Sequence, residues 1–185
     1  MVLFIDACAR PQSRTRYLAK RALRKISEEY QRLDIIKENL KPLDFDTLSA
    51  REENIIKADF SDDSFHYAKQ FRDADEIVIA APYWDLSFPA ALKCYIENIC
   101  VNGITFIYNE QGIPQGLCNA KRLIYVTTAG GFIPGDNYGY NYINKLCADF
   151  FGIKNTVYIK AEGLDIYGAD VKGIIKKAED EIDAL

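Results

Sequence analysis

An unbroken run of apolar residues, Ile77 to Ala81, constrains the fold of this chain more than any other stretch. Strands with such runs occur where both faces of a sheet are covered, as in parallel sheets flanked by helices. Pro82 follows at once and has no N–H to give to a sheet ladder, so the strand ends there. The run therefore predicts a buried strand in a layered α/β fold.

A loop and then a helix follow this strand. Residues 83–86, Tyr-Trp-Asp-Leu, form the predicted loop. We expect Ser87 to cap the helix and Pro89 to be tolerated in its first turn. Helical spacing gives that helix one inward face, made of Leu92, Tyr95, Ile96 and Ile99. Ligands of open α/β sheets bind at the carboxyl ends of strands, so the loop is a candidate binding segment.

The rest of the chain alternates between predicted strands and helices. Four more apolar segments are typical of strands, at residues 2–5, 33–36, 122–128 and 156–159. Helices are expected to begin at Ser13 or Thr15, at Asp46, at Asp62 and at Asp170, because these residues cap helices well. The first helix has an apolar stripe made of Leu18, Ala19, Ala22, Leu23, Ile26, Tyr30 and Leu33. Another helix is expected to carry Tyr142, Leu146 and Phe150.

This alternation predicts a parallel sheet with helices on both faces. Five strands suit a three-layer, flavodoxin-like α/β fold with strand order 2-1-3-4-5, in a single domain over residues 1–185. Residues 103–108 are expected to be extended. Turn signals at 109–112 and 114–116 make this segment part of a hairpin-like excursion.

Length, charge and cysteine content bound the possible classes of protein. At 185 residues the chain can bury a full core, and its net charge of −4 argues weakly against a nucleic-acid or anionic-membrane partner. No apolar run approaches the roughly 20 residues that cross a bilayer. The five cysteines are odd in number and form no C-x-x-C pair, so we expect a cytoplasmic protein with reduced thiols and no metal.

The first loop, residues 6–15, joins a strand to a helix N-terminus, where free N–H groups and the helix dipole favour anions. Ser13 and Thr15 add hydroxyl groups, and Arg10, Arg14 and Arg16 add positive charge. The loop matches neither G-x-G-x-x-G nor G-x-x-x-x-G-K-[ST], so it has no dinucleotide or nucleoside-triphosphate fingerprint. The alternative is a helix capped by Ser13 with solvated arginines.

Two more loops lie at the carboxyl ends of predicted strands. Tyr83 and Trp84 could hold a flat aromatic ring, the alternative being that Trp84 packs beneath the next helix. Residues 127–131, Thr-Thr-Ala-Gly-Gly, end the neighbouring strand with two glycines, which let backbone approach a ligand, although an ordinary turn would look the same. An anion loop, an aromatic loop and a backbone-amide loop at one sheet edge together describe a flavin mononucleotide (FMN) site.

Other chemistries have less support. His66 is the only histidine, and without a second histidine or a G-x-S-x-G motif a hydrolytic triad has no basis. Cys8 lies in the first loop near a helix N-terminus, where a thiolate would be favoured, but we expect it to be structural.

The sequence resembles the FMN-dependent NADH-azoreductase and NAD(P)H:quinone oxidoreductase family, from residue 1 to about residue 160. The matching segments are Ser13-Arg-Thr15 and residues 82–93, 103–108 and 127–131. The resemblance implies that the FMN phosphate is bound by Arg10, Ser13, Arg14 and Thr15. It implies that the isoalloxazine ring and the ribityl chain are lined by Pro82, Tyr83, Trp84, Asp85 and Leu86. The pyrimidine edge of the ring would meet Thr128, Ala129, Gly130 and Gly131.

The family often has asparagine at the position of Asp85. A carboxylate aimed at the ring would oppose a reduced flavin anion, so either Asp85 turns away or the flavin potential is lower than usual. No side-chain acid or base is required, because the cofactor carries the chemistry. The backbone N–H groups of Gly130 and Gly131 are the expected charge stabilisers.

The expected function is ping-pong hydride transfer, in which NADH or NADPH reduces the flavin and a quinone, azo compound or similar acceptor then takes its place. The alternatives are a flavodoxin-type electron carrier and a flavin-free binding or regulatory protein. The hairpin excursion and the aromatic loop after Gly131 argue against a carrier, which needs an exposed flavin edge and no substrate pocket.

Aromatic residues in or beside loops predict a homodimer with shared flavin sites, since a lone domain has no evident core for Phe106, Tyr108, Phe132, Tyr138, Tyr140 and Tyr142. In the family, the aromatic residue at the position of Tyr108 reaches the partner's flavin. We therefore expect Tyr108 and Phe132 in the substrate pocket. The alternative is a single-chain lid over its own flavin.

Overall fold

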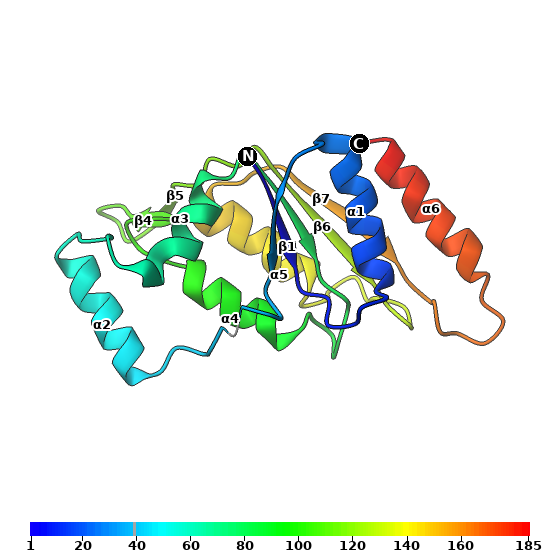
Figure 1. Ribbon diagram of the computed structural model, residues 1–185, viewed down its shortest axis with the longest axis horizontal. Helices are drawn as coiled ribbons and strands as arrows, with labels where there is room; N and C mark the ends of the chain where they lie inside the picture. The colour runs from blue at the N-terminus through cyan, green and yellow to red at the C-terminus, as the bar shows by residue number, and fades with distance from the viewer. Residues whose placement is uncertain (39) are drawn as a thin grey trace.

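Strand β3 (Glu76–Ala80) is the central strand of a five-stranded parallel sheet, as the computed structural model shows for residues 1–38 and 40–185 (Figure 1). The order across the sheet is β2-β1-β3-β6-β7. The other strands are β1 (Val2–Asp6), β2 (Gln31–Asp34), β6 (Arg122–Thr128) and β7 (Thr156–Ala161). Counted along the chain these five strands have the order 2-1-3-4-5, so the predicted flavodoxin-like topology is confirmed.

Alternating side chains of the strands feed two hydrophobic cores. Phe4, Val78 and Ile124 pack against α1 (Arg14–Ile26) and α6 (Val171–Asp183). Leu3, Ile77 and Leu123 lie on the opposite face of the sheet. The helices α3 (His66–Asp73), α4 (Ala90–Ile99) and α5 (Tyr140–Leu146) cover that face. The sheet is therefore covered on both sides, which explains the unbroken apolar runs in its strands.

The predicted helices were confirmed where a capping residue and a helical spacing of apolar residues occur together. Ser13 caps α1 by accepting a hydrogen bond from Arg16 N, and Asp170 caps α6 by accepting one from Gly173 N at 2.9 Å. The predicted inward residues of α4 are all buried. Ser87, however, does not cap α4. The helix begins at Ala90 after an extended Pro89, and Ser87 Oγ instead donates to the carbonyl of Tyr138 at 2.9 Å.

Several predicted boundaries were wrong by a few residues. Helix α1 ends at Ile26 because Ser27 is extended, so Tyr30 and Leu33 lie outside it and β2 starts earlier than expected. Helix α2 (Phe45–Ile56) is capped by Asp44, not Asp46, in a reciprocal box with Thr47. Capping needs a side chain placed before the first turn, and at this site both acids satisfy the sequence rule.

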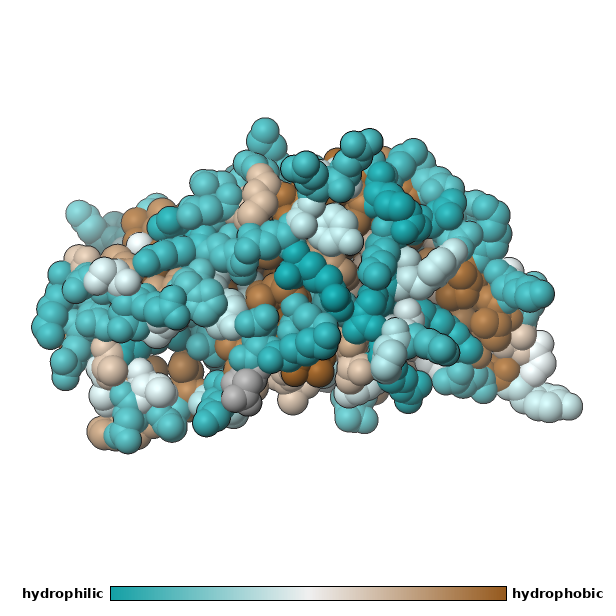
Figure 2. Space-filling view, in the orientation of Figure 1, coloured by the Kyte–Doolittle hydropathy of each residue, from teal (hydrophilic) through white to brown (hydrophobic). Residues whose placement is uncertain are grey.

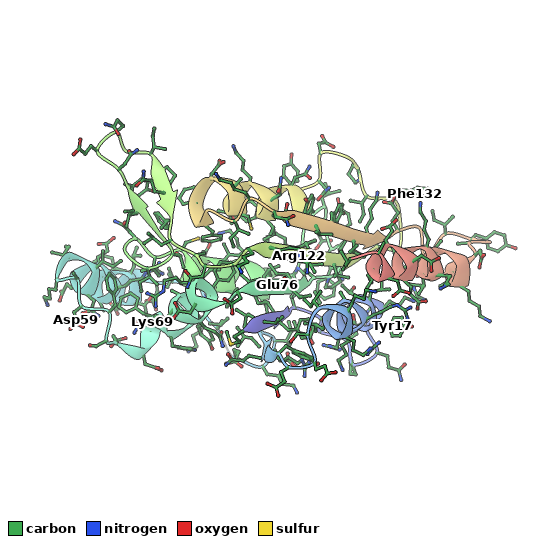
Figure 3. All side chains as sticks on the ribbon, turned by 90° about the horizontal axis from the view of Figure 1, so that it is seen from above. Tyr17, Asp59, Lys69, Glu76, Arg122 and Phe132 are labelled. Carbon is green, nitrogen blue, oxygen red and sulfur yellow. The ribbon has the colours of Figure 1, made fainter. Side chains whose placement is uncertain are left out.

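Further boundaries differ near the helix ends and at the hairpin. Asp62 caps the short 3₁₀ turn Asp63–Phe65 that precedes α3, and α5 passes at Cys147 into a π-helical turn ending at Phe151. Only β4 (Phe106–Tyr108) of the segment 103–108 is extended, and it pairs antiparallel with β5 (Pro114–Gly116). The predicted hairpin is thus confirmed, and it projects from the body of the molecule (Figure 3).

Three of the six loop aromatics are absorbed by the core, which contradicts the expectation that none would be. The ring of Phe106 lies 5.0 Å from that of Phe150, Tyr140 stacks on Tyr158 at 4.2 Å, and Tyr142 packs against Phe88. The other three remain exposed, with fractions of 51% for Tyr108, 75% for Phe132 and 68% for Tyr138.

The outer surface is mainly hydrophilic on the face shown in Figure 2, with hydrophobic residues gathered in patches near α1 and α6. Glu76 and Arg122, at the start of the paired strands β3 and β6, form an ion pair at 3.0 Å (Figure 3). Within the described ranges, no helix combines the length and apolar content that crossing a bilayer requires.

Gly116 in β5 tests how the hairpin is held. An added Cβ would lie 2.1 Å from the backbone N of Gly152 and the backbone C of Phe151, which cannot move aside like a side chain. We expect Gly116→Ala to lower the free energy of unfolding by about 3 kcal/mol or more, measured by urea denaturation.

Gly135→Ala is the matched control, because an added Cβ at Gly135 meets no atom within 4 Å. Equal stabilities of the two variants would contradict the packing of β5 on the turn at Gly152.

Candidate functional site

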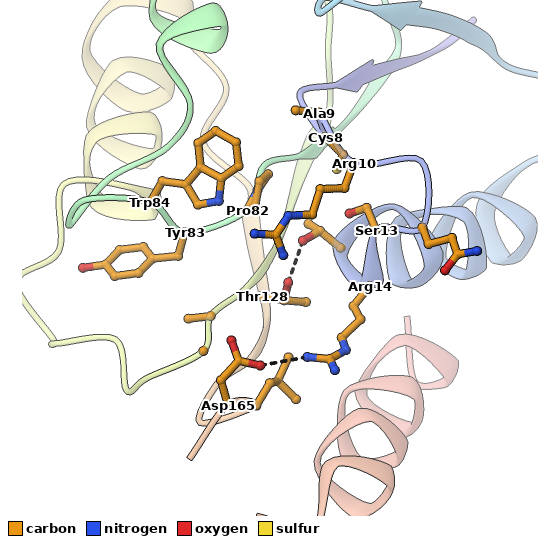
Figure 4. A pocket seen from close by; sticks show the side chains of 15 residues that line it. Cys8, Ala9, Arg10, Ser13, Arg14, Pro82, Tyr83, Trp84, Thr128 and Asp165 are labelled. Atoms are coloured by element: carbon orange, nitrogen blue, oxygen red, sulfur yellow. Dashed lines mark hydrogen bonds and ion pairs between the residues drawn. The ribbon is translucent and has the colours of Figure 1, made fainter. Parts of the chain in front are cut away.

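A cavity of about 430 Å³ lies where β1, β3 and β6 end, at the lower edge of the sheet in Figure 1 (Figure 4). Its volume suits a small organic ligand. Ten of the predicted cofactor-binding residues line it, namely Arg10, Ser13, Arg14, Thr15, Pro82, Tyr83, Trp84, Thr128, Ala129 and Gly130. Asp85, Leu86 and Gly131 lie outside the lining. The topology therefore brings the three predicted loops together at one edge.

One end of the cavity is built from the N-terminus of α1. Ser13 Oγ accepts from Arg16 N at 3.2 Å, and the Ser13 carbonyl accepts from Tyr17 N at 3.0 Å. Arg16 and Tyr17 thus have the first N–H groups of the helix with a partner in the chain. The N–H groups of Arg14 and Thr15 come before them and are free for an anion. The guanidinium groups of Arg10 and Arg14 extend over the same region (Figure 4). This end has the donors and the positive charge that a phosphate requires.

Two hydroxyl groups meet at the floor of the cavity. Thr15 Oγ1 and Thr128 Oγ1 are 2.7 Å apart, which joins α1 to the end of β6 (Figure 4). Two hydroxyls that share one hydrogen bond retain one unshared proton. The pair therefore offers one further donor to a ligand.

The opposite wall is aromatic. Pro82, Tyr83 and Trp84 follow β3 directly, and Tyr83 N donates to the Thr128 carbonyl at 3.0 Å, which fixes this loop beside the next one. Trp84 is 39% exposed and lines the cavity. It is therefore not packed beneath α4, which was the alternative interpretation of this residue. Tyr83 and Trp84 thus give this wall the aromatic surface on which a flat ring can pack.

Asp85 and Leu86 lie in a tight turn and do not line the cavity. Trp84 and Ser87 exchange two backbone hydrogen bonds, of 3.0 and 2.8 Å. Closing this turn puts Asp85 at φ 51° and Leu86 at φ 67°, in the left-handed region that costs a non-glycine residue roughly 1 kcal/mol or more. Asp85 is not among the residues that line the cavity, so the direction of its carboxylate stays a prediction.

Asp6 and Arg16 form a buried ion pair behind the first loop, a feature the sequence analysis missed. Asp6 is fully buried at the end of β1 and accepts from Arg16 Nε at 2.5 Å and from Arg32 at 2.7 Å. Burial alone would raise the pKa of Asp6, but the hydrogen bonds from Arg16 and Arg32 lower it below its ordinary value. Arg16 is therefore not the free positive charge that we expected. An acid at the end of an apolar strand was the available signal.

Asp165 was also missed, and it comes from the loop after β7. Its carboxylate accepts from Arg14 at 3.3 Å, and Leu164 and Asp165 line the cavity (Figure 4). An added Cβ at Gly130 would lie 2.4 Å from Asp165 Oδ2, so a larger residue at this position would displace that carboxylate. The loop follows the fifth strand, so the rule that selected the other three loops would have found it.

The remaining candidates lie elsewhere or are inert. Burial raises the pKa of Cys8 to about 12, and its Sγ lies 3.6 Å from the Ala80 carbonyl, so it is a buried thiol. His66 Nδ1 lies 2.8 Å from the Asp63 carbonyl in its own turn, and its ring packs against that of Tyr67 at 3.6 Å. Tyr108 and Phe132 do not line the cavity. Among the described residues, no cluster of His, Cys, Asp or Glu could hold a metal ion.

The sequence matches the family described as having a flavodoxin-like fold over residues 1–185. The chain belongs to this flavodoxin-like family. It is similar to FMN-dependent NADH:quinone oxidoreductase 2 of Clostridium acetobutylicum, with 38% identity over 95% of this chain and 92% of the relative. A Clostridium beijerinckii FMN-dependent NADH:quinone oxidoreductase is 34% identical over 97% of this chain and 94% of its own. The resemblance stated from the sequence is confirmed.

Solved structures agree with this assignment. The azoreductase of Bacillus anthracis superposes on this flavodoxin-like chain with a TM-score of 0.85 and 26% identity, over 99% of this chain and 96% of the azoreductase. The similarity therefore covers nearly the whole of this chain.

Asp6→Asn tests the buried pair. The pKa of Asp6 in the folded chain lies below its ordinary value of 3.8, so its stabilisation is full above that value and is lost as pH falls through the lower folded pKa. We expect the variant to lose about 3 kcal/mol of unfolding free energy at pH 7, because Arg16 loses its buried partner. The difference from wild type should shrink below about pH 4 in denaturant titrations.

Asp73→Asn is the control, since Asp73 pairs with Arg72 at 2.7 Å but is half exposed. It should change stability by less than about 1 kcal/mol. A loss at Asp6 no larger than the loss at Asp73 would contradict the role of the buried pair.

Proposed function

We propose that this chain is an FMN-dependent oxidoreductase that passes electrons from NADH to quinones, azo compounds or similar acceptors. One observation supports the proposal most strongly. A single cavity has hydrogen-bond donors and positive charge suited to a phosphate at one end, and an aromatic wall opposite. Full-length similarity to FMN-dependent NADH:quinone oxidoreductases and to an azoreductase supports it.

The donors of the cavity fit the chemistry of FMN. A phosphate dianion would be held by the N–H groups of Arg14 and Thr15, by Ser13, and by the guanidinium groups of Arg10 and Arg14. Tyr83 and Trp84 would hold the isoalloxazine ring, and Thr128, Ala129 and Gly130 its pyrimidine edge. The free proton of the Thr15–Thr128 pair lies between the two ends and could serve the ribityl chain.

When bound, FMN supplies hydride acceptance from the nicotinamide and electron delivery to the acceptor. The residues of the chain would bind the cofactor and orient it. The N–H groups of Gly130 and Gly131 would stabilise negative charge at the pyrimidine edge, since backbone donors fixed in place cost no reorganisation. Asp85 does not line the cavity, and we propose that its carboxylate turns away from the ring, where it would otherwise oppose that charge.

The two alternatives have less support. An electron carrier would leave a flavin edge exposed and would not need the projecting β4–β5 hairpin or the exposed aromatic residues after Gly131. A flavin-free protein would leave the similarity to FMN-dependent enzymes unexplained. We place the chain in the cytoplasm. All five cysteines are unpaired in the part of the chain that the structure describes, which supports a reducing compartment.

We further propose a homodimer in which the partner chain completes each site. Tyr108, on the projecting hairpin, and Phe132 and Tyr138, on the loop after β6, are exposed aromatics of the kind that mark interfaces. Tyr108 would reach the partner's flavin as part of the substrate pocket. Phe132 lies close to Gly163, beside the loop that carries Asp165.

Absorbance of the purified chain tests the flavin proposal. The protein should be yellow, or become so with added FMN, and anaerobic NADH should bleach it within seconds. A yellow protein that NADH does not bleach would indicate a carrier. A colourless protein that takes up no FMN would overturn the proposal.

Tyr108→Ala tests the shared site. Loss of one aromatic contact at the substrate face should lower acceptor turnover about fivefold, while FMN affinity stays unchanged. Tyr30→Ala is the control, because Tyr30 is also partly exposed but directly precedes β2, at the edge of the sheet opposite the cavity. Sedimentation that shows a fully active monomer at micromolar concentration would contradict the dimer.

A further inference from the structure

The guanidinium of Arg16 makes its hydrogen bonds within the first loop and to Asp6. Its guanidinium donates to the carbonyl of Arg10 at 2.6 Å, to that of Pro11 at 3.0 Å and to that of Cys8, while Nε donates to Asp6. The side chain is 13% exposed. The Arg16 guanidinium therefore ties three backbone carbonyls of the loop to one planar group, and Asp6 holds that group in place.

The planar peptide bond turns this arrangement into a prediction about N–H groups. In a trans peptide, the carbonyl of one residue and the N–H of the next point in opposite directions, and the described chain has no cis peptide. The carbonyls of Cys8 and Pro11 point inward to Arg16, so the N–H groups of Ala9 and Gln12 point outward. The carbonyl of Arg10 also points inward, but it adds no outward N–H group, because the next residue, Pro11, has none.

Both outward N–H groups belong to residues that line the cavity. Ala9 and Gln12 lie in its wall beside Ser13 and Arg14. Neither N–H donates to a protein acceptor among the residues described. Two unpartnered amides thus stand next to the end of the cavity that carries the free N–H groups of α1.

Arg16 does not act as a counter-charge for an anion. Its guanidinium pairs with the buried carboxylate of Asp6. Arg32 bridges Asp6 and Asp34, and Lys37 also pairs with Asp34. The positive charge facing the cavity comes from Arg10 and Arg14. What Arg16 contributes is the conformation of the loop.

We propose that Arg16, held by Asp6, is a positioning residue that orients the N–H groups of Ala9 and Gln12 toward the terminal phosphate of FMN. The proposal rests on the function proposed above. It assigns to this family member's first loop a support that acts on the phosphate alone and leaves the ring site untouched.

Comparison of FMN with riboflavin isolates the phosphate. Arg16→Lys keeps the charge but cannot bond three carbonyls and a carboxylate at once. We expect it to weaken FMN binding about 10- to 100-fold, the effect of losing one charge-assisted hydrogen bond. Riboflavin affinity, measured by the same fluorescence titration, should stay within about twofold of wild type, because riboflavin lacks the phosphate.

Arg21→Lys is the matched control. Arg21 lies on the same helix and makes a two-bond pair with Asp183, of 2.9 and 2.6 Å, but contacts no residue of the first loop. It should leave both affinities unchanged. Equal losses for FMN and riboflavin in Arg16→Lys, or no loss for either, would overturn the proposal.

The wild-type chain provides a second test that does not depend on how the variant folds. In amide NMR spectra, the N–H signals of Ala9 and Gln12 should shift with FMN and stay in place with riboflavin. Unchanged signals on saturation with FMN would overturn the positioning role. Failure of the wild type to bind FMN at all would instead overturn the proposed function.

Discussion

Coverage of the central sheet on both faces governs where this protein can bind anything. Buried parallel strands must satisfy their own backbone groups, so free polar groups gather only where the strands end. At the carboxyl edge, the loops after β1, β3, β6 and β7 meet around one cavity. The fold thus places a helix N-terminus, an aromatic wall and a glycine-rich loop within the reach of one ligand.

Electrostatics at this edge is divided between arginines with different tasks. Arg16 is neutralised by Asp6 and shapes the loop from behind. Arg14 is held across the cavity by Asp165, an exposed pair worth about 1 kcal/mol or less, and Arg10 is exposed on the lining. An incoming phosphate can therefore take Arg14 from Asp165 at little cost, whereas it cannot displace the buried pair behind the loop.

The sequence was sufficient for the parts governed by period and burial. The apolar runs of β1, β3 and β6 and the face of α4 made of Leu92 to Ile99 follow directly from the two-sided core. The sequence was insufficient where two nearby residues fitted a helix cap or helix start equally well and tertiary contacts decided between them. Asp44 rather than Asp46 caps α2, and the turn at Trp84–Ser87 displaces the start of α4 to Ala90. Asp6 and Asp165 went unnoticed because their partners, Arg16 and Arg14, were assigned to the ligand alone.

A crystal structure of the chain with FMN tests the central claim most directly. The account predicts the phosphate at the N-terminus of α1, within hydrogen-bonding distance of Ser13 and the N–H groups of Arg14 and Thr15. It also predicts the ring against Tyr83 and Trp84. FMN bound with its phosphate away from the first loop, or bound outside the cavity at the carboxyl edge, would contradict it.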